Sequence, residues 1–212
     1  MRSFRHWTPR YILDRARDVC YQRLNPNAPW LTPRAVEVLS SWLRPTDAGF
    51  EWGSGRSTSW FASRTDHLTS VENNPMWFEK VSANLSQQGL SSRVQYILME
   101  DGMGSDPDCQ YVQAIKEVSD RSLDFCLVDG LHRDSCADRA LPKLKRGGLL
   151  IIDNANWYIP RSPRSCSPNS RSFEDGFPTQ QWKVVFDALA TWRCIWTSNG
   201  VTDTAIWVCP AK

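Results

Sequence analysis

The apolar residues of this chain alternate between short continuous runs and longer amphipathic segments. Continuous runs, such as Phe125 to Val128, are typical of strands that are buried on both faces. Five such strands are predicted at 48–52, 67–72, 94–99, 123–129 and 149–153, with helices between them at 58–64, 75–88, 111–118 and 135–145. Strands that alternate with helices indicate an α/β fold with a Rossmann-like, doubly wound sheet and helices on both faces.

The pattern changes on both sides of this region. Helices are predicted before it at 9–24 and 32–43, the second because Thr32-Pro33 is a typical helix start. After it, a helix at 179–191 precedes two strands, at 193–197 and 205–209, which a turn joins. We therefore expect seven strands, mostly parallel with a C-terminal antiparallel strand, and divide the single compact chain into an N-terminal helical cap, 1–45, and a main domain, 46–212.

Residues 160–176 fit neither pattern, because they are rich in Ser, Pro and Arg and poor in apolar side chains. Two interpretations stay open for this segment. It is either a mobile surface loop or a mobile lid over a site.

Charge and cysteine content limit which binding partners and which cellular compartment we expect for this protein. The net charge of +2 gives no overall electrostatic reason to expect nucleic acid as a partner. Seven cysteines without metal-ligand spacing indicate reduced thiols and a cytoplasmic location. No run approaches the roughly 18 apolar residues of a membrane span.

The arginine-rich helix at 9–24 is either a solvated surface or a surface for peripheral contact with anionic lipid or with a second subunit, as in a homodimer.

A glycine turn follows the first strand of the main domain. Gly53 and Gly55 allow close approach of the backbone to a ligand, and the helix start after them favours a polar or anionic group. A dinucleotide fingerprint would need a third glycine, where Thr58 stands. The arrangement resembles the first motif of class I S-adenosylmethionine (SAM)-dependent methyltransferases. That resemblance implies a SAM site that includes Glu51, Gly53, Gly55, Ser57 and Thr58.

Acidic residues also end the next two strands. In an open parallel sheet, ligands bind beyond the carboxyl ends of the strands. Glu72, followed by Asn73, is expected to bind the ribose hydroxyls of SAM, although it could instead cap the helix that begins at Pro75. Asp101 is preferred over Glu100 as the acceptor for the adenine amino group, with two solvated acids as the alternative.

The fourth and fifth strands end in Asp129 and in Asp153-Asn154. If these strands are neighbours, two carboxylates and an amide oxygen converge on one spot, which suits Mg²⁺. Acids that cap the following segments are the alternative. His132 lies close enough to reach the same pocket.

These two segments resemble the metal-dependent small-molecule O-methyltransferases, such as the catechol and caffeoyl-CoA enzymes. The resemblance implies that Asp129, Asp153 and Asn154 hold a divalent cation that binds the acceptor hydroxyl beside SAM. His132 stands where the family usually has a lysine. Gly130, which is expected to open the pocket, also occurs in a related branch that methylates antibiotic sugars.

The sequence therefore predicts a SAM-dependent O-methyltransferase for a small-molecule or sugar hydroxyl. His132 and Asp129 are the expected catalytic residues, Asp129 also touches SAM, and Trp157 and Tyr158 wall the acceptor. Two alternatives remain: a metal-independent SAM methyltransferase with another acceptor, and a non-catalytic methyltransferase-like binding partner. A dehydrogenase is disfavoured by the missing third glycine.

Overall fold

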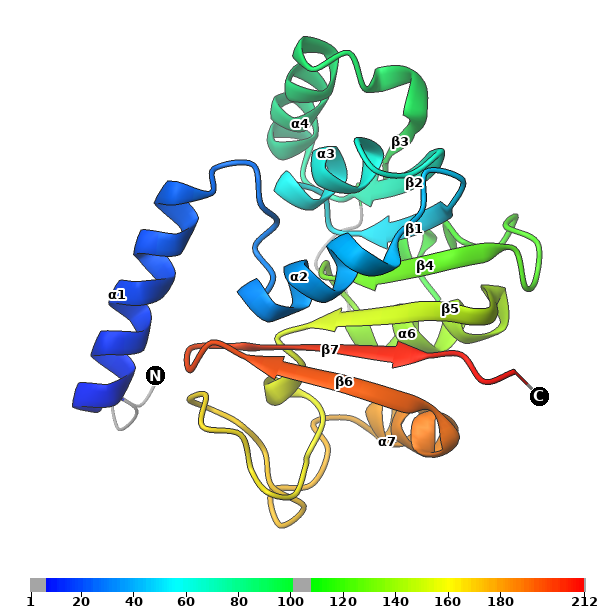
Figure 1. Ribbon diagram of the computed structural model, residues 1–212. Helices are drawn as coiled ribbons and strands as arrows, with labels where there is room; N and C mark the ends of the chain where they lie inside the picture. The colour runs from blue at the N-terminus through cyan, green and yellow to red at the C-terminus, as the bar shows by residue number, and fades with distance from the viewer. Residues whose placement is uncertain (1–6, 101–107, 212) are drawn as a thin grey trace.

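A seven-stranded sheet forms the centre of the molecule in the computed structural model, which describes residues 7–100 and 108–211 (Figure 1). The strands lie in the order β3-β2-β1-β4-β5-β7-β6, and β7 is antiparallel to both of its neighbours. This confirms the predicted mostly parallel sheet with a C-terminal antiparallel strand. The strands are β1 (Ala48–Trp52), β2 (His67–Glu72), β3 (Val94–Leu98), β4 (Leu123–Val128), β5 (Leu144–Asp153), β6 (Arg193–Ser198) and β7 (Asp203–Val208).

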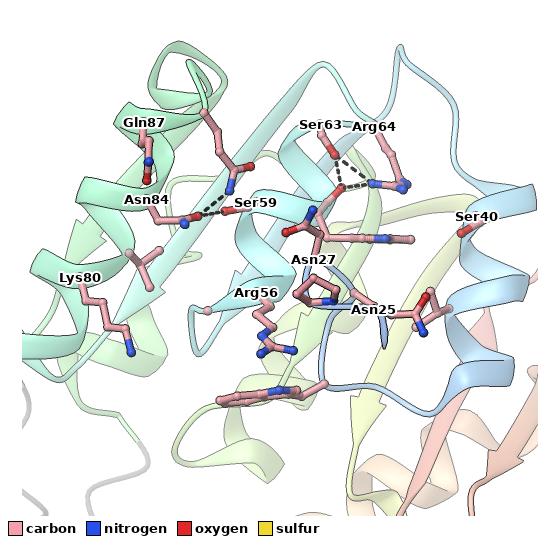
Figure 2. Close-up of a pocket in the computed structure, with 18 of the residues that line it drawn as sticks. Asn25, Asn27, Ser40, Arg56, Ser59, Ser63, Arg64, Lys80, Asn84 and Gln87 are labelled. Carbon is pink, nitrogen blue, oxygen red and sulfur yellow. Dashed lines mark hydrogen bonds between the residues drawn. The ribbon is translucent and has the colours of Figure 1, made fainter. Parts of the chain in front are cut away.

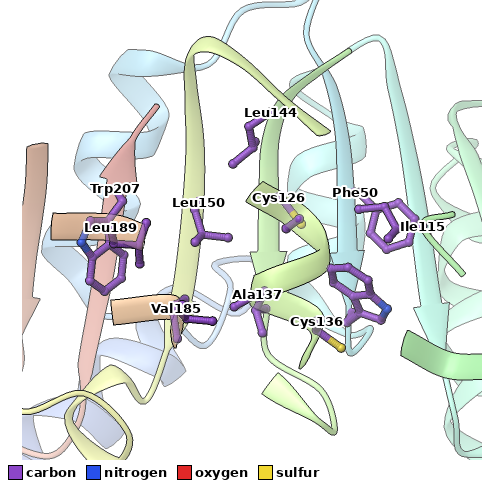
Figure 3. Close-up of a cluster of buried hydrophobic side chains, with 14 of the residues drawn as sticks. Phe50, Ile115, Cys126, Cys136, Ala137, Leu144, Leu150, Val185, Leu189 and Trp207 are labelled. Atoms are coloured by element: carbon purple, nitrogen blue, oxygen red, sulfur yellow. The ribbon is translucent and has the colours of Figure 1, made fainter. Parts of the chain in front are cut away.

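Helices cover both faces of this sheet. One apolar cluster packs α2, α3 and α4 on the first face, and a second cluster packs α5, α6 and α7 on the other, around side chains such as Cys126 and Leu150 (Figure 3). The described helices are α1 (Pro9–Leu24), α2 (Pro33–Trp42), α3 (Arg56–Ala62), α4 (Pro75–Gln87), α5 (Gln110–Gln113), α6 (Arg133–Ala140) and α7 (Gln180–Ala188). The doubly wound architecture is therefore as predicted.

Several elements differ from the sequence-based boundaries. Helix α6 ends at Ala140, five residues earlier than expected, because Pro142 cannot continue it and a short 3₁₀ turn follows. Gly147 and Gly148, predicted to end that helix, lie within β5, where their backbones bond to Cys209 of the C-terminal segment. Helix α3 begins two residues earlier than expected, and α5 is a single turn.

Helix α1 stands at the rim of the molecule and contributes no buried residue (Figure 1). Its contacts are polar: the Asn199 side chain donates to Asp18 Oδ1 at 3.1 Å, and Arg56 donates to Gln22 Oε1 at 3.2 Å. The division into a helical cap and a main domain remains a prediction, as do the lipid and subunit contacts of α1. Within the described ranges, no helix is long and apolar enough to span a membrane.

The segment 160–176 contains neither helix nor strand but is anchored at several points. Ser167 donates to Asp203 Oδ1 at 2.5 Å, and Asn156 donates to the carbonyl of Pro168 at 3.1 Å. Arg171 Nε donates to the carbonyl of Trp157 at 2.7 Å. These bonds hold the segment beside the carboxyl end of β5, where a lid would have to lie.

Candidate functional site

The candidate site lies where the direction of strand order reverses, between β1 and β4. In the register of the sheet, Trp52 pairs with Val128, and Val128 pairs with Ile152. The residues that follow, Gly53, Asp129 and Asp153, therefore leave the sheet side by side at its carboxyl edge. Ligands of open α/β sheets bind at such a switch point.

The glycine turn packs directly against the chain that leaves β4. Gly53 has a φ of +89°, and a Cβ there would lie 2.6 Å from the backbone nitrogen of Gly130. A Cβ on Gly130 would lie 1.8 Å from the hydroxyl oxygen of Tyr111. The expectation that Gly130 opens the pocket is therefore wrong, because its missing side chain is replaced by close backbone and tyrosine packing.

Glu51 lies beneath this turn with no exposed surface. Its Oε1 accepts hydrogen bonds from the hydroxyls of Thr58 and Ser70, the latter at 2.7 Å. Burial raises the pKa of Glu51 to about 7, although these hydroxyls partly oppose the shift. Glu51 thus ties β1 to β2 and to the first turn of α3, and we expect it to act on SAM through the shape of the turn.

Because the pKa of Glu51 is raised, protein stability should fall as the pH rises. The pKa of this carboxyl is 4.5 in the unfolded chain and about 7 in the folded protein. Between these two pH values the folded protein keeps the proton that the unfolded chain has lost, so the free energy of unfolding decreases through this window and changes no further above it. The shift corresponds to on the order of 3 kcal/mol. Urea unfolding of Glu51→Gln should show a shallower decline from pH 5 to 8 than the wild type. Equal pH slopes in the two proteins would refute a buried, protonated Glu51.

Glu72 is the centre of a second hydrogen-bond network and is 5% exposed. Its Oε1 accepts the backbone N–H groups of Asn73 and Asn74 at 3.0 and 2.9 Å. Its Oε2 accepts the backbone N–H and the hydroxyl of Ser54 at 3.1 and 2.7 Å. The Ser54 hydroxyl also lies 2.6 Å from Tyr96 Oη. If a ribose hydroxyl displaced the Ser54 hydroxyl from Glu72, Ser54 would still have Tyr96 as a hydrogen-bond partner.

Arg133 fills the space between the ends of β4 and β5. Its guanidinium donates to the main-chain oxygens of Gly130, Asp129 and Asp153 at 3.0, 2.6 and 2.6 Å. It also donates to Asp129 Oδ1 at 2.8 Å and to Asn154 Oδ1 at 3.1 Å. A guanidinium has five N–H donors, so these five bonds use all of them. Asp129 and Asn154 thus meet at one guanidinium through side-chain oxygens, whereas Asp153 reaches it only through its main-chain oxygen.

The residues at this position do not fit a divalent cation. A metal would meet the positive guanidinium, which already occupies Asp129 Oδ1 and Asn154 Oδ1. The Oδ1 of Asp153 accepts the hydroxyl of Thr204 at 2.8 Å. Elsewhere in residues 7–100 and 108–211, no three or more His, Cys, Asp or Glu side chains are grouped so as to hold a metal.

Burial raises the pKa of both carboxyls in this cluster. For Asp129 the positive charge of Arg133 opposes the rise, and for Asp153 the negative charge of Asp129 adds to it. The Asp129 side chain keeps 28% of its surface exposed, whereas that of Arg133 keeps 13%. Asp129 is therefore the more exposed partner of this ion pair.

A cavity of about 810 Å³, here called the acceptor cavity, adjoins the cluster. Asn154 and Trp157 line it from the β5 side, Trp30 and Arg56 line it from the other side, and α1 closes it. Trp157 lines this cavity, and its role as a wall for the acceptor stays a prediction. Tyr158 does not line this cavity; its ring stacks on Trp182 at 5.0 Å.

The other predicted site residues lie in different surroundings. His132 precedes α6 with a left-handed φ of 45°, is half-buried, and does not line the acceptor cavity. Ser57 is buried in the first turn of α3. Asp101 lies outside the described residues.

Sequence reasoning missed Arg133, Ser54 and the pair of Trp30 and Arg56. Arg133 follows Asp129 by four residues, a spacing that allows an ion pair across one helical turn and could have suggested it. For Ser54, the only feature of the sequence that could have indicated a role in the site was its position between Gly53 and Gly55. Trp30 and Arg56 are brought together by the fold, with the guanidinium 5.3 Å from the ring centre.

Comparisons with known proteins identify the family of this chain and show which solved structures share its fold. A family described as a methyltransferase domain matches residues 50–155, half of the chain. No curated protein sequence matches. Among solved structures, a provisionally identified caffeoyl-CoA O-methyltransferase from Staphylococcus aureus has 17% identity and a TM-score of 0.59, covering 95% of this chain and 92% of its own.

Two further structures share the fold at low identity. An rRNA methylase from Streptococcus thermophilus has 13% identity and a TM-score of 0.53, covering 83% of this chain and 93% of its own. A provisionally identified methyltransferase from Streptococcus mutans, solved with S-adenosylhomocysteine (SAH), has 13% identity and a TM-score of 0.54, covering 81% and 93%. The fold predicted from the sequence is thereby confirmed.

Proposed function

Because the chain belongs to the methyltransferase domain family and is a class I SAM-dependent methyltransferase, we propose that it methylates a hydroxyl oxygen of an acceptor bound in the acceptor cavity. The observation that carries this proposal is the meeting of three features at one switch point: the glycine turn, the carboxyl end of β4, and a cavity that reaches Asn154. A small molecule or a sugar fits a cavity of about 810 Å³.

SAM is expected to lie along the glycine turn, with its ribose at Glu72 and its methyl group directed at the acceptor cavity. Gly53 and Gly55 would let the backbone approach SAM, and Thr58 would hold the turn through Glu51. Asp101 remains the expected partner of the adenine amino group. The sulfonium of SAM already activates its methyl group, so the chain's main task is to hold the acceptor oxygen in line with the methyl–sulfur bond.

Asp129 is our first choice for the group that receives the acceptor proton. Arg133 binds its Oδ1 and not its Oδ2, and burial raises the pKa of the Asp129 carboxyl. Asp129 does not itself line the acceptor cavity, so the acceptor oxygen would have to reach past Asn154 to meet it. His132 is the second choice, because it lies three residues after Asp129 and an imidazole can accept a proton. Cation assistance is omitted from this mechanism, because Arg133 already supplies a positive charge between the two strands.

The proposal is tested by measuring SAH release from SAM with catechol and with free sugars as acceptors, in Mg²⁺ and in excess chelator. We expect release with at least one hydroxyl acceptor and equal rates in both conditions. Release that stops in chelator would contradict the metal-free mechanism. A protein that binds SAM but releases no SAH with either acceptor class would contradict the proposed acceptor chemistry.

A further inference from the structure

A second cavity, here called the basic groove, lies on the face of the sheet covered by α2, α3 and α4. It has a volume of about 1060 Å³ and is bordered by the segment that joins α1 to α2 (Figure 2). Three cations line it: Arg56 and Arg64 on or beside α3, and Lys80 on α4. No Asp or Glu is among its described lining residues, which sets it apart from the balanced charge of the whole chain.

Each of these cations rests on a tryptophan ring. The charged groups of Arg56, Arg64 and Lys80 lie 5.3, 4.2 and 4.5 Å from the ring centres of Trp30, Trp60 and Trp77, respectively. Within the described part of the chain, none of the three makes an ion pair with a carboxylate. Cations that are held by aromatic rings and lack acidic partners are available to an anionic ligand.

The spacing of the cations indicates an extended ligand with repeated charges. Figure 2 shows Lys80, Arg56 and Arg64 distributed along the groove rather than gathered at one point. The amide side chains of Asn25, Asn27, Asn84 and Gln87 also line the groove, and Trp30 is 55% exposed. Amides can bond to base edges, exposed indole rings can contact bases, and cations can follow a phosphate backbone.

We propose that the basic groove binds a single-stranded RNA segment, with Arg56, Arg64 and Lys80 on its phosphodiester backbone. The groove and the acceptor cavity share Pro26, Trp30 and Arg56, so a strand in the groove runs up to the acceptor cavity. The link between the bound strand and methyl transfer rests on the proposed function. RNA binding itself requires neither SAM nor turnover, so the two proposals fail independently.

The test is fluorescence anisotropy of the full chain with a labelled oligouridine of about ten nucleotides, a length typical of such sites. Three phosphate contacts predict that affinity falls roughly 20-fold between about 50 and 200 mM salt, from a slope of about −0.7 per contact. Lys80→Met should weaken binding several-fold and reduce the slope by about 0.7. Lys183→Met, which removes an exposed cation from α7 on the other face of the sheet, is the matched control and should change neither value.

Inorganic polyphosphate, added as a competitor, separates RNA from simple polyanion binding. We expect oligouridine to bind more tightly than polyphosphate of the same charge, because its bases also contact the groove. Equal affinities would overturn the assignment to RNA. No measurable oligouridine binding at low salt, or equal effects of Lys80→Met and Lys183→Met, would overturn the groove as the binding site. A SAM titration of Lys80→Met with unchanged affinity shows that this variant is folded.

Discussion

Glu72→Ala is expected to weaken SAM binding by roughly 100-fold, from the loss of the hydrogen bond between a ribose hydroxyl and a charged carboxylate together with the loss of the shape of the glycine turn. The same substitution leaves the backbone N–H groups of Ser54, Asn73 and Asn74 without their acceptor. The glycine turn should therefore lose its shape as well as its ribose contact. Calorimetric titration with SAM measures the effect.

Two further variants separate the effect of the Glu72 carboxylate from general effects of substitution nearby. Glu72→Gln keeps one acceptor oxygen and should fall between the wild type and Glu72→Ala. Glu79→Ala removes an exposed acid from α4 nearby and should bind SAM like the wild type. Thermal unfolding of all three reports whether the fold persists. SAM affinity that is unchanged in a folded Glu72→Ala protein would rule out the ribose role.

Arg133→Met is expected to destabilise the protein by about 3 kcal/mol, the lower end of the range for a buried ion pair, because the partly buried carboxylate of Asp129 loses its counter-charge. Five hydrogen bonds are lost at once, including those to the main-chain oxygens of Asp129 and Asp153. Turnover should fall on the order of 100-fold, since the ends of β4 and β5 are no longer held together. Urea unfolding and SAH release measure the two effects.

Arg139→Met is the matched control on the same helix. Its guanidinium makes one exposed ion pair with Asp108, so its removal should cost about 1 kcal/mol or less. Arg133→Lys should restore only part of the loss, because an ammonium cannot reproduce the planar bonding of a guanidinium. If Arg133→Met is as stable and as active as Arg139→Met, Arg133 does not organise the site.

The fold was largely predictable because its strands are buried on both faces. The run from Phe125 to Val128 is continuous and apolar, and such a run needs no knowledge of its neighbours to be recognised as a strand. Gly147 and Gly148 were misplaced because a pair of glycines also ends helices. Only their pairing with Cys209, more than sixty residues later, assigns them to β5.

The closeness of the acids at the ends of β4 and β5 was predictable, but the arginine between these strand ends was not. Asp129 and Asp153 could be placed together because parallel strands bring their carboxyl ends to one edge. Arg133 resembles any arginine in the first turn of a surface helix, so its inward direction emerges only from the fold. The charge of the basic groove was missed for a similar reason. The net charge of +2 counts cations such as Lys80 and Arg64 together with acids elsewhere in the chain, so it does not reveal a local cluster of cations.

A titration of the purified chain with SAM, once in Mg²⁺ and once in excess chelator, tests the central claim most directly. We predict micromolar affinity in both conditions, since Glu72 and the glycine turn are expected to bind SAM without help from a cation. Absence of SAM binding in both conditions, or SAM binding only in Mg²⁺, would contradict this SAM site.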